Sequence, residues 1–504
     1  MSFRVAFLAL LVTGCGSSEG DRGATLRADI AGSNAEARRV ATAASQAGLT
    51  SVDGTGQVVP GLASSWRIAD DGLSVIFRLR PRSWPDGKPV TASDVVASFR
   101  HASSAGSHNP LRTLLSGFEN GAAVVGGTKP PSALGVGAPI DNVVEIRLAG
   151  AMPNLLAMLA EPEFAVTRAG LKLPLGPFRV DDLATVPIAL DRNPAMPGSG
   201  AVSIAGIALT AVDDPGAAIA RFARDRTDLV IGQGLAGFDD ARLLAASKAL
   251  RVEPTWGVYG YLVNTTRGPL ADVRVRRALA MAIDRDDLGS RLFGVALPPV
   301  LGLVPPLPSQ RVPVLPDWAI AAPAARLELA RQLLTAAGFS AIAPLTVTIS
   351  LPDAREHALV AAAIATDWAR IGVRTLTIAR PDVLHAKTIA RGAFELALVE
   401  RTSATDTPLA FLLPFTCAAK AGGYCNAGAD ASLAAAVATA DPVAQAATFG
   451  GAEAAMIADT PFIPLFAPIR WALVARRVTG WSGNAGGQHP LALLGIARGK
   501  SSKP

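Results

Sequence analysis

VVPGLASSWRIADDGLSVIFRLRP (58–81) and SWPDGKPVTASDVVASFRHA (83–102) carry the strongest structural signals in this chain. Apolar residues recur at every second position of a predicted strand, at Leu73, Val75, Phe77 and Leu79. Trp-Pro-Asp-Gly at 84–87 predicts a turn. Thr91 and Asp94 have the spacing of a capping box, which predicts that a helix begins there. Together they predict a strand, a turn and a helix in one domain.

Downstream, predicted strands and helices alternate, which is typical of an α/β protein. Residues 207–231 have the pattern of a strand, a helix and a second strand. Asp272 is predicted to cap a helix over 273–283, with its arginines on the outside. The Gly- and Pro-rich stretch 117–139 is predicted to be a surface insertion. Further predicted strands cover 143–148, 345–351, 373–379 and 394–400, and further helices cover 324–337, 355–371 and 382–391.

The chain has 504 residues, which predicts two or three domains with ample apolar cores. Hydrophobic residues make up 50% of it, but no stretch reaches the roughly 20 consecutive apolar residues of a membrane-spanning helix. The longest uncharged stretch, 292–309, contains five prolines and is predicted to be an extended loop. The sequence therefore predicts a soluble body.

The N-terminus has the features of an export signal. Arg4 precedes the short apolar run VAFLALLV at 5–12, and Thr13-Gly14 precede Cys15. VTGC also resembles the bacterial lipobox, in which the cysteine is diacylated and becomes the mature N-terminus. An ordinary cleaved signal with an incidental cysteine is the alternative. We expect an exported protein of the periplasm or cell envelope, anchored to a membrane only through Cys15.

The other two cysteines are Cys417 and Cys425. In a chain bound for an oxidising compartment, two remaining cysteines are expected to pair. A redox-active dithiol is the alternative, but such dithiols usually have a CxxC spacing. A structural disulfide is therefore predicted.

Charge and motifs argue against several function classes. The net charge of +6 is spread along the chain without a basic block, so no nucleic-acid partner is expected. GxSxG, HExxH, GxxxxGK[ST] and a GxGxxG after a strand are absent, so no enzyme is predicted. The five histidines are scattered without metal-ligand spacing, so neither a metal nor another cofactor is expected.

Several motifs, in their order along the chain, resemble the extracellular solute-binding proteins of family 5, the dipeptide, oligopeptide and nickel receptors of ABC transporters. The block at 58–102 resembles the family signature near the N-terminus. The later motifs are LGPFRV (175–180), IALDRNP (188–194), YLVNTTRGPLADVRVRRALAMAIDRDDL (261–288), ARQLLTAAGF (330–339), WARIGV (368–373) and VTGWSGN (478–484). The resemblance extends from about Leu49 to Leu494.

The resemblance implies a type II periplasmic-binding-protein-like α/β fold, with two large hinged lobes and a smaller inserted α+β domain. Crossovers are expected near 262–263 and 469–470. The expected order is signal peptide 1–14, lipidated tether 15–23, lobe I 24–48, inserted domain 49–165, lobe I again 166–260, lobe II 261–469, lobe I 470–497 and polar tail 498–504. A monomer is expected that captures a ligand between its lobes and delivers it to an ABC permease and ATPase.

The segment ERTSATDTPLAF (400–411) resembles the family's ligand loop. Peptide receptors place an aspartate four residues before its proline and a tryptophan three residues earlier. Ala404 and Arg401 occupy these positions here, and Thr402 lies between them. An ammonium group in a dry cleft needs a counter-charge. We therefore hypothesise that peptides do not bind through a free N-terminus, and that Arg401 faces an anionic group; a shifted alignment would let Asp406 or Glu400 bind an ammonium instead.

Aromatic residues complete the candidate ligand site. Trp256, Tyr259 and Tyr261 precede the expected first crossover, and Tyr424 lies between the two cysteines. Packing within the core or between lobes is the alternative role for each. The ligand is expected to be a small organic molecule, peptide-like or other, and anionic under the Arg401 hypothesis. A sensory or chaperone lipoprotein with the same fold is the alternative function.

Overall fold

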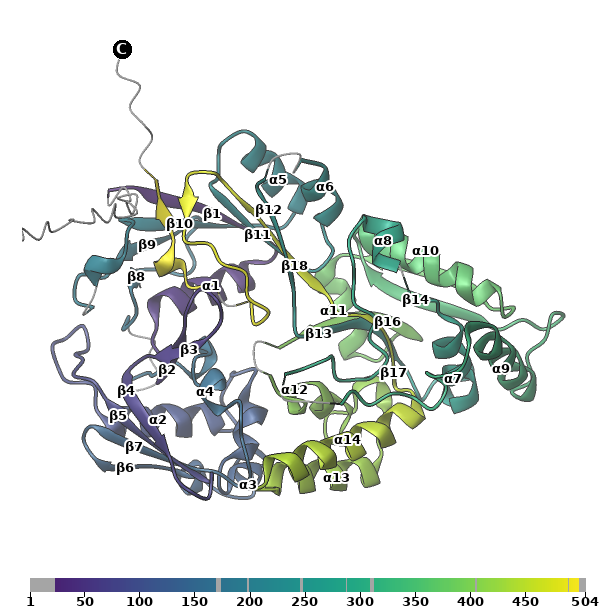
Figure 1. The fold of residues 1–504 in the computed structure, drawn as a ribbon, viewed down its shortest axis with the longest axis horizontal. Coiled ribbons are helices and arrows are strands. Elements are labelled where there is room, and N and C mark those ends of the chain that lie inside the picture. Colours follow the sequence, from purple (N-terminus) through teal and green to yellow (C-terminus); the bar gives the residue numbers. More distant parts are fainter. Residues whose placement is uncertain are drawn as a thin grey trace, which may run out of the picture.

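The computed structural model describes residues 23–168, 174–196, 199–244, 248–286, 288–308, 312–403, 406–487 and 489–497. Cys15 and Ala404 lie outside these described residues. Two large sheets and one smaller sheet organise the described chain (Figure 1). We name the parts built on them lobe I, lobe II and the inserted domain. Among the described residues, no helix combines the length and apolar character needed to cross a membrane.

Lobe I contains a seven-stranded sheet. Its central strand β1 (Thr25–Ala31) runs parallel to both of its neighbours, and the remaining pairs are antiparallel. In spatial order the others are β12 (Leu250–Pro254), β18 (Ile469–Val474) and β11 (Leu229–Gln233) on one side, and β10 (Gly206–Val212), β9 (Ile188–Arg192) and β8 (Phe178–Val180) on the other. The predicted strand, helix and strand over 207–231 are confirmed as β10, α5 (Pro215–Ala223) and β11.

Lobe II contains a five-stranded sheet. Its order is β15 (Arg374–Arg380), β14 (Thr346–Pro352), β16 (Leu396–Thr402), β13 (Gly257–Val263) and β17 (Phe462–Phe466). β14 runs parallel to β15 and β16, and helices α10 (Arg355–Ala369) and α11 (Asp382–Ala390) make the two crossovers. These elements confirm the alternation predicted over 345–400. Helix α9 (Pro323–Ala336) confirms the helix predicted before them.

The inserted domain contains a four-stranded sheet in the order β4 (Ala63–Ile68), β5 (Ser74–Leu79), β7 (Val143–Arg147) and β6 (Val136–Ile140). Helix α2 (Ala92–Ser103) begins at the predicted capping box, in which Oδ2 of Asp94 accepts from N–H of Thr91 at 2.9 Å. The prediction that 117–139 is only a surface insertion was wrong. α3 (Gly121–Val125) and β6 lie within it, and their few apolar residues, including Val124 and Val136, enter the domain core.

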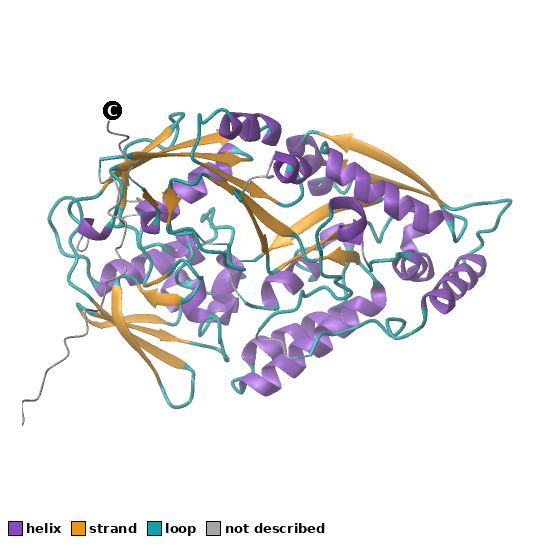
Figure 2. Ribbon diagram, turned by 45° about the horizontal axis from the view of Figure 1, so that its top comes forward, coloured by secondary structure: helices purple, strands orange, loops and turns teal. Residues whose placement is uncertain are grey.

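Helices cover the sheets on their outer sides (Figure 2). Further helices are α1 (Asn34–Ser45), α4 (Leu155–Met158), α6 (Phe238–Leu244), α7 (Val273–Ala282), α8 (Leu288–Phe293), α12 (Leu409–Leu412), α13 (Ala427–Ala438) and α14 (Pro442–Asp459). Asp272 caps α7, as predicted. Not every arginine of α7 lies outside: Arg276 is buried because its guanidinium donates to the backbone carbonyl of Asp459, at the end of α14.

The chain passes between the two large sheets twice. It leaves lobe I at the end of β12 and enters lobe II at β13, and it returns through Ala467 and Pro468 between β17 and β18. Residues 262–263, expected at a crossover, lie inside β13, whereas residues 469–470 begin β18. The structure thus shows which strand each of these residues belongs to. The division of the chain into segments that move as domains stays a prediction.

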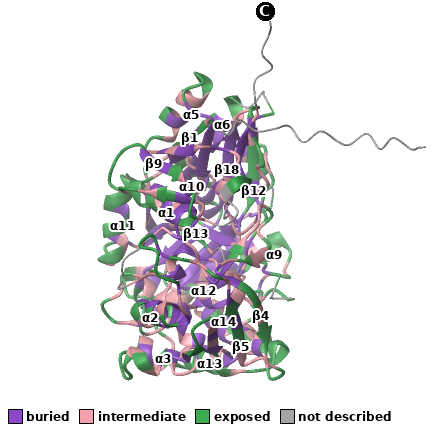
Figure 3. Cartoon of the chain, turned by 90° about the vertical axis from the view of Figure 1, so that its left-hand side faces the viewer, coloured by how far each residue is buried: buried purple, intermediate pink, exposed green. Residues whose placement is uncertain are grey.

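Buried residues lie mainly along the strands, and the outer helices have exposed faces (Figure 3). Cys417 and Cys425 form a disulfide, so the predicted pairing is confirmed. The disulfide closes a short loop before α13. Tyr424 lies in this loop and packs into the core of lobe II rather than outward.

Candidate ligand-binding site

The carboxyl ends of strands from both lobes face each other. β1 and β11 are parallel and end at Ala31 and Gln233, and β16 of lobe II ends at Thr402. Ligands of open α/β sheets bind outside such strand ends. A contact joins the lobes at this edge: Gly234 has a positive φ of 61°, and a Cβ on it would overlap the carboxylate of Glu400. A glycine therefore lets Glu400 of lobe II lie directly against the end of β11.

Arg470 supplies positive charge at this junction. It lies in β18 opposite Gln233, and its Nε donates to Oε1 of Gln233 at 3.2 Å. Its Nη1 is buried and has no hydrogen-bond acceptor among the described residues. Burial lowers the pKa of Arg470, while the charges of Glu253, Glu400 and others act against that shift. An anionic ligand group would give this guanidinium the acceptor that the described protein does not provide.

Glu400 supplies the opposing negative charge. Burial raises the pKa of its carboxyl to about 7, because the attraction of Arg470 only partly offsets burial and Glu36 adds repulsion. Glu36 belongs to α1, where its carboxylate accepts from N–H of Ser33 at 2.8 Å in a capping box. The three charged side chains thus come from β16, β18 and α1. Burial therefore weakens the negative charge that Glu400 sets against Arg470 near neutral pH, while Glu253, opposite Arg470 in the sheet, adds a second negative charge.

Arg401 lies in β16 next to Glu400, and successive strand side chains point to opposite faces. Its guanidinium lies 5.5 Å from the ring centroid of Phe415, and Nη1 donates weakly to the carbonyl of Phe411 at 3.5 Å. Burial lowers its pKa to about 10. No ion pair joins Arg401 to a carboxylate of the described chain. The side chains of Arg401 and Arg470 therefore do not point toward one common site, although both are partly buried cations.

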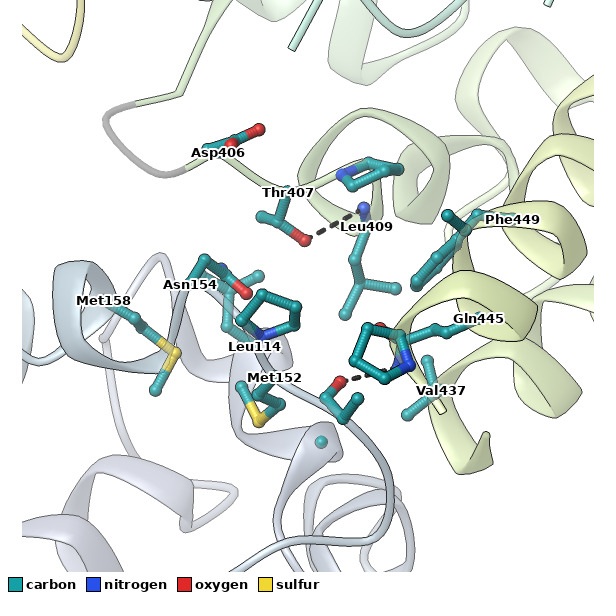
Figure 4. Close-up of a pocket in the computed structure, with 16 residues that line it drawn as sticks. Leu114, Met152, Asn154, Met158, Asp406, Thr407, Leu409, Val437, Gln445 and Phe449 are labelled. Atoms are coloured by element: carbon teal, nitrogen blue, oxygen red, sulfur yellow. Dashed lines mark hydrogen bonds between the residues drawn. The ribbon is translucent and has the colours of Figure 1, made fainter. Parts of the chain in front are cut away.

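The predicted ligand loop borders a small pocket of about 60 Å³ between lobe II and the inserted domain (Figure 4). Thr407 begins its lobe II side, where Oγ1 accepts from N–H of Leu409 at 3.3 Å. Asp406 lies at the edge, and Asn154 and Met158 face it from the inserted domain (Figure 4). Most of the remaining wall is apolar. A pocket of this size accepts a small side chain or ligand substituent, not a whole ligand.

The same pocket lies where the inserted domain contacts lobe II. Nε2 of Gln445, on α14, donates to the backbone carbonyl of Ala151 at 2.6 Å (Figure 4). N–H of Ala151 in turn donates to the carbonyl of Thr439 at 2.9 Å. These bonds connect the inserted domain to the turn between α13 and α14.

The predicted aromatic residues do not come together in the cleft. Tyr259 and Tyr261 are fully buried in lobe II: the first stacks on Phe466 and bonds Nδ1 of His357 at 3.0 Å, and the second packs near Trp368. Tyr424 donates to Oδ2 of Asp459 at 2.8 Å.

Trp256 differs, because it is half-buried at the passage between the sheets. Its N–H donates to the carbonyl of Ala485, and its carbonyl accepts from N–H of Ser403 at 2.9 Å. Thr402 is exposed at the end of β16. Of the predicted residues, Trp256, Arg401 and Thr402 therefore lie nearest the junction of the lobes.

Sequence reasoning missed Arg470 as a binding candidate, although it placed a crossover there. No local motif marks this arginine, because its partner Gln233 lies 237 residues earlier and meets it only through strand pairing. Gly234 was missed for the same reason. The sequence suggested Glu400 as a ligand-binding residue only if the alignment of the ligand loop was shifted.

Two facing α/β lobes with charged groups at their junction, linked by two passages of the chain, define a two-lobed solute-binding receptor. A model of bacterial extracellular solute-binding proteins, family 5 (middle region), matches residues 57–423. The chain belongs to this family of extracellular solute-binding proteins.

Individual relatives agree with this assignment. The periplasmic oligopeptide-binding protein OppA of Salmonella typhimurium is 25% identical over 463 residues, covering 88% of this chain and 84% of OppA. The murein tripeptide-binding protein MppA of Escherichia coli superposes with a TM-score of 0.83 at 22% identity, covering 96% of this chain and 100% of MppA. The unliganded open form of MppA gives 0.69 at 21% identity, covering 96% and 99%.

The burial of Glu400 leads to a pH-dependent prediction. A carboxyl whose pKa rises on folding contributes stability below its unfolded pKa and loses that contribution as pH rises through its folded pKa. Glu400→Gln is therefore expected to match the wild type near pH 4 and to be more stable at pH 8 by about 1–2 kcal/mol, after allowance for partial solvent screening. Urea denaturation of both proteins across this range measures the difference.

Glu328→Gln is the matched control, because Glu328 is exposed on α9. A wild type that gains stability over Glu400→Gln between pH 4 and pH 8 contradicts the burial of this carboxyl.

Proposed function

We propose that this chain is the substrate-binding receptor of an ABC importer and that its ligand carries a carboxylate or another anionic group. The ligand binds between lobes I and II, and the closed protein delivers it to the permease and ATPase. The observation that carries the proposal is the guanidinium of Arg470, whose Nε donates to Gln233 at the end of β11 and whose Nη1 is buried against Gly487 without an acceptor among the described residues.

The anionic group follows from the local charge balance. An isolated charge in a water-poor site is costly, and a bidentate guanidinium–carboxylate pair is among the strongest compensating contacts. Glu400 compensates Arg470 only in part, because burial raises the pKa of its carboxyl to about 7, and Glu253 of β12 supplies further negative charge. Arg401 provides a second cation beside the ligand loop. A ligand with a carboxylate and a small apolar substituent would suit Arg470 and the pocket beside Thr407.

Peptides are one class of ligand that carries a carboxylate and small apolar substituents. The relatives OppA and MppA are named as oligopeptide- and murein peptide-binding proteins. We propose that a peptide, if it is the ligand, is held through its carboxylate rather than through the aspartate that peptide receptors use for the N-terminus. Trp256, Arg401, Thr402 and Asp406 are proposed ligand contacts. Tyr259, Tyr261 and Tyr424 are proposed to act indirectly, by fixing the strands and loop that carry the site.

Anchoring is a separate part of the proposal. Residues 1–14 are proposed to be removed on export, and Cys15 is proposed to carry the lipid that holds the receptor at the membrane. Family membership and the periplasmic relatives support export, and the lipobox-like VTGC supports lipidation. Incorporation of an alkyne-labelled fatty acid into the wild type but not into Cys15→Ala is the expected result.

Native mass spectrometry of freshly purified protein tests the ligand directly. The expected result is an additional mass that is lost on denaturation and that gains a methyl group when carboxyl groups are esterified. A bound ligand without any anionic group would contradict the proposal. So would a ligand whose retention is unchanged in Arg470→Gln.

A further inference from the structure

A second cavity, of about 440 Å³, lies between lobe I and the inserted domain. Its walls come from α1, from the hairpin of β2 (Thr50–Val52) and β3 (Val58–Pro60), from the segment after β5 and from residues 489–493. None of the described residues that line it belongs to lobe II. Arg470 and Glu400 do not line the cavity, and its volume lies within the roughly 300–1,000 Å³ typical of small-molecule sites.

Two arginines supply charge to this cavity. Arg80 and Arg82 follow β5 two residues apart, and both line it. Each has a buried Nε without a hydrogen-bond acceptor, and neither makes an ion pair with a carboxylate of the described chain. Burial, together with the nearby charge of Arg80, lowers the pKa of Arg82. Two neighbouring guanidinium groups without counter-ions favour binding of an anion.

Gln46, at the end of α1, adds a buried polar group to the cavity wall. Its side chain is only 7% exposed, it lines the cavity, and its Oε1 has no donor among the described residues. A buried amide oxygen without a donor is costly, so a hydroxyl or amide group of a bound molecule would stabilise it. The remaining wall is largely apolar and includes Val40, Val59, Leu175 and Leu491.

The other charged residues of the cavity already have partners. Arg39 pairs with Glu161 at 2.6 Å and with Glu163 at 2.8 Å. His489 lies 2.9 Å from Glu253. Asp53 accepts from N–H of Thr55 and of Gln57 in its own turn. Unlike Arg39, Arg80 and Arg82 have no carboxylate partner among the described residues.

From these observations we propose that the cavity between lobe I and the inserted domain is a second ligand site, which binds a small amphipathic organic anion. Arg80 and Arg82 bind its acidic group, and the apolar wall beside α1 accommodates its hydrophobic body. Arg470, Gln233 and Glu400, which form the interlobe site, are not among the residues that line this cavity.

Calorimetric titration of the full chain with decanoate, below its micelle concentration, tests the proposal. Decan-1-ol serves as the neutral partner and inorganic phosphate as an anion without an apolar body. Decanoate is expected to bind, and both comparison compounds are expected to bind at least about tenfold more weakly, since each lacks one of the two contacts. No decanoate binding, or equal binding of phosphate or decan-1-ol, would overturn the proposal.

Variants locate the site. Arg80→Gln/Arg82→Gln is expected to weaken decanoate binding at least about tenfold. Arg78→Gln, at an exposed residue of β5 just before them, is the matched control and should bind as the wild type does. Ala43→Trp places a large side chain at an exposed rim position of the cavity and should block binding without disturbing the core.

Arg401→Gln, on β16 of lobe II, separates this site from the interlobe site. It should leave decanoate binding unchanged, whatever it does to the transported ligand. Decanoate binding that is lost in Arg401→Gln, or kept in both Arg80→Gln/Arg82→Gln and Ala43→Trp, would place the site elsewhere and overturn the proposal.

Discussion

Arg470→Gln is expected to weaken binding of the transported ligand by about a hundredfold, while the protein stays folded. The glutamine keeps a polar side chain beside Gln233 but removes the charge and the bidentate geometry that a carboxylate uses. Loss of one partner from a desolvated charged pair costs about 2–5 kcal/mol of binding free energy, and it acts mainly by making the ligand dissociate faster. The ligand identified by mass spectrometry, titrated calorimetrically into both proteins, measures this change.

Arg476→Gln is the matched control, because Arg476 is an exposed arginine shortly after β18. Its affinity should equal that of the wild type. An Arg470→Gln protein that binds the ligand with unchanged affinity shows that the guanidinium does not contact it. Circular dichroism and thermal melting of the variant check that its lobes remain folded.

Asp228→Asn is expected to lower the free energy of unfolding by about 3–4 kcal/mol, because it removes the negative charge of a buried cluster and leaves its positive charges without a partner. Asp228 is 1% exposed and precedes β11. It accepts from N–H and Nε of Arg27, both at 3.0 Å, and from Nε of Arg477 at 2.7 Å. This carboxylate therefore ties β1 and β11 to the segment after β18. Urea denaturation measures the loss.

The same carboxylate has a predicted pH signature. Burial alone would raise its pKa, but the hydrogen bonds from Arg27 and Arg477 outweigh burial and lower it. Its stabilisation is therefore present above the unfolded pKa, about 4, and is lost as the pH falls through the folded value. The difference between wild type and Asp228→Asn should shrink in acid. Asp181→Asn, at an exposed aspartate of lobe I, is the control; an equal loss in both variants contradicts the argument.

Much of the fold could be predicted because its signals are local. The alternation over 345–400, the capping box at Thr91 and the cap at Asp272 each depend on residues close in the chain. The two cysteines could be paired from the export signal and their number. The division into lobes was predicted from the order of the family motifs, because the periodicity of apolar residues alone does not predict it. Residues 117–139 were mispredicted because Gly and Pro hid the few apolar positions that form β6.

The candidate site could be predicted only in part, because it is assembled from distant strands. The ligand loop was found through its sequence, but Arg470 meets Gln233 and Glu400 only after three strands of two sheets are in place. The tyrosines were overvalued as a cluster: Tyr259 and Tyr261 are neighbours in the sequence, yet both enter the core of lobe II. Position along the chain predicted their location near the lobe junction but not the direction of their side chains.

A thermal-shift screen with matched pairs of compounds, each carboxylate beside its own primary amide, tests the central claim most directly. Short peptides, amino acids and small dicarboxylates make up the pairs. Every compound that raises the melting temperature is expected to carry the free carboxylate. Its amide should give no shift, and Arg470→Gln should lose the shift. At a hundred times Kd the stabilisation should reach about 2.7 kcal/mol. Equal shifts from carboxylates and amides, or shifts that persist in Arg470→Gln, would contradict a carboxylate ligand held by Arg470 between the lobes.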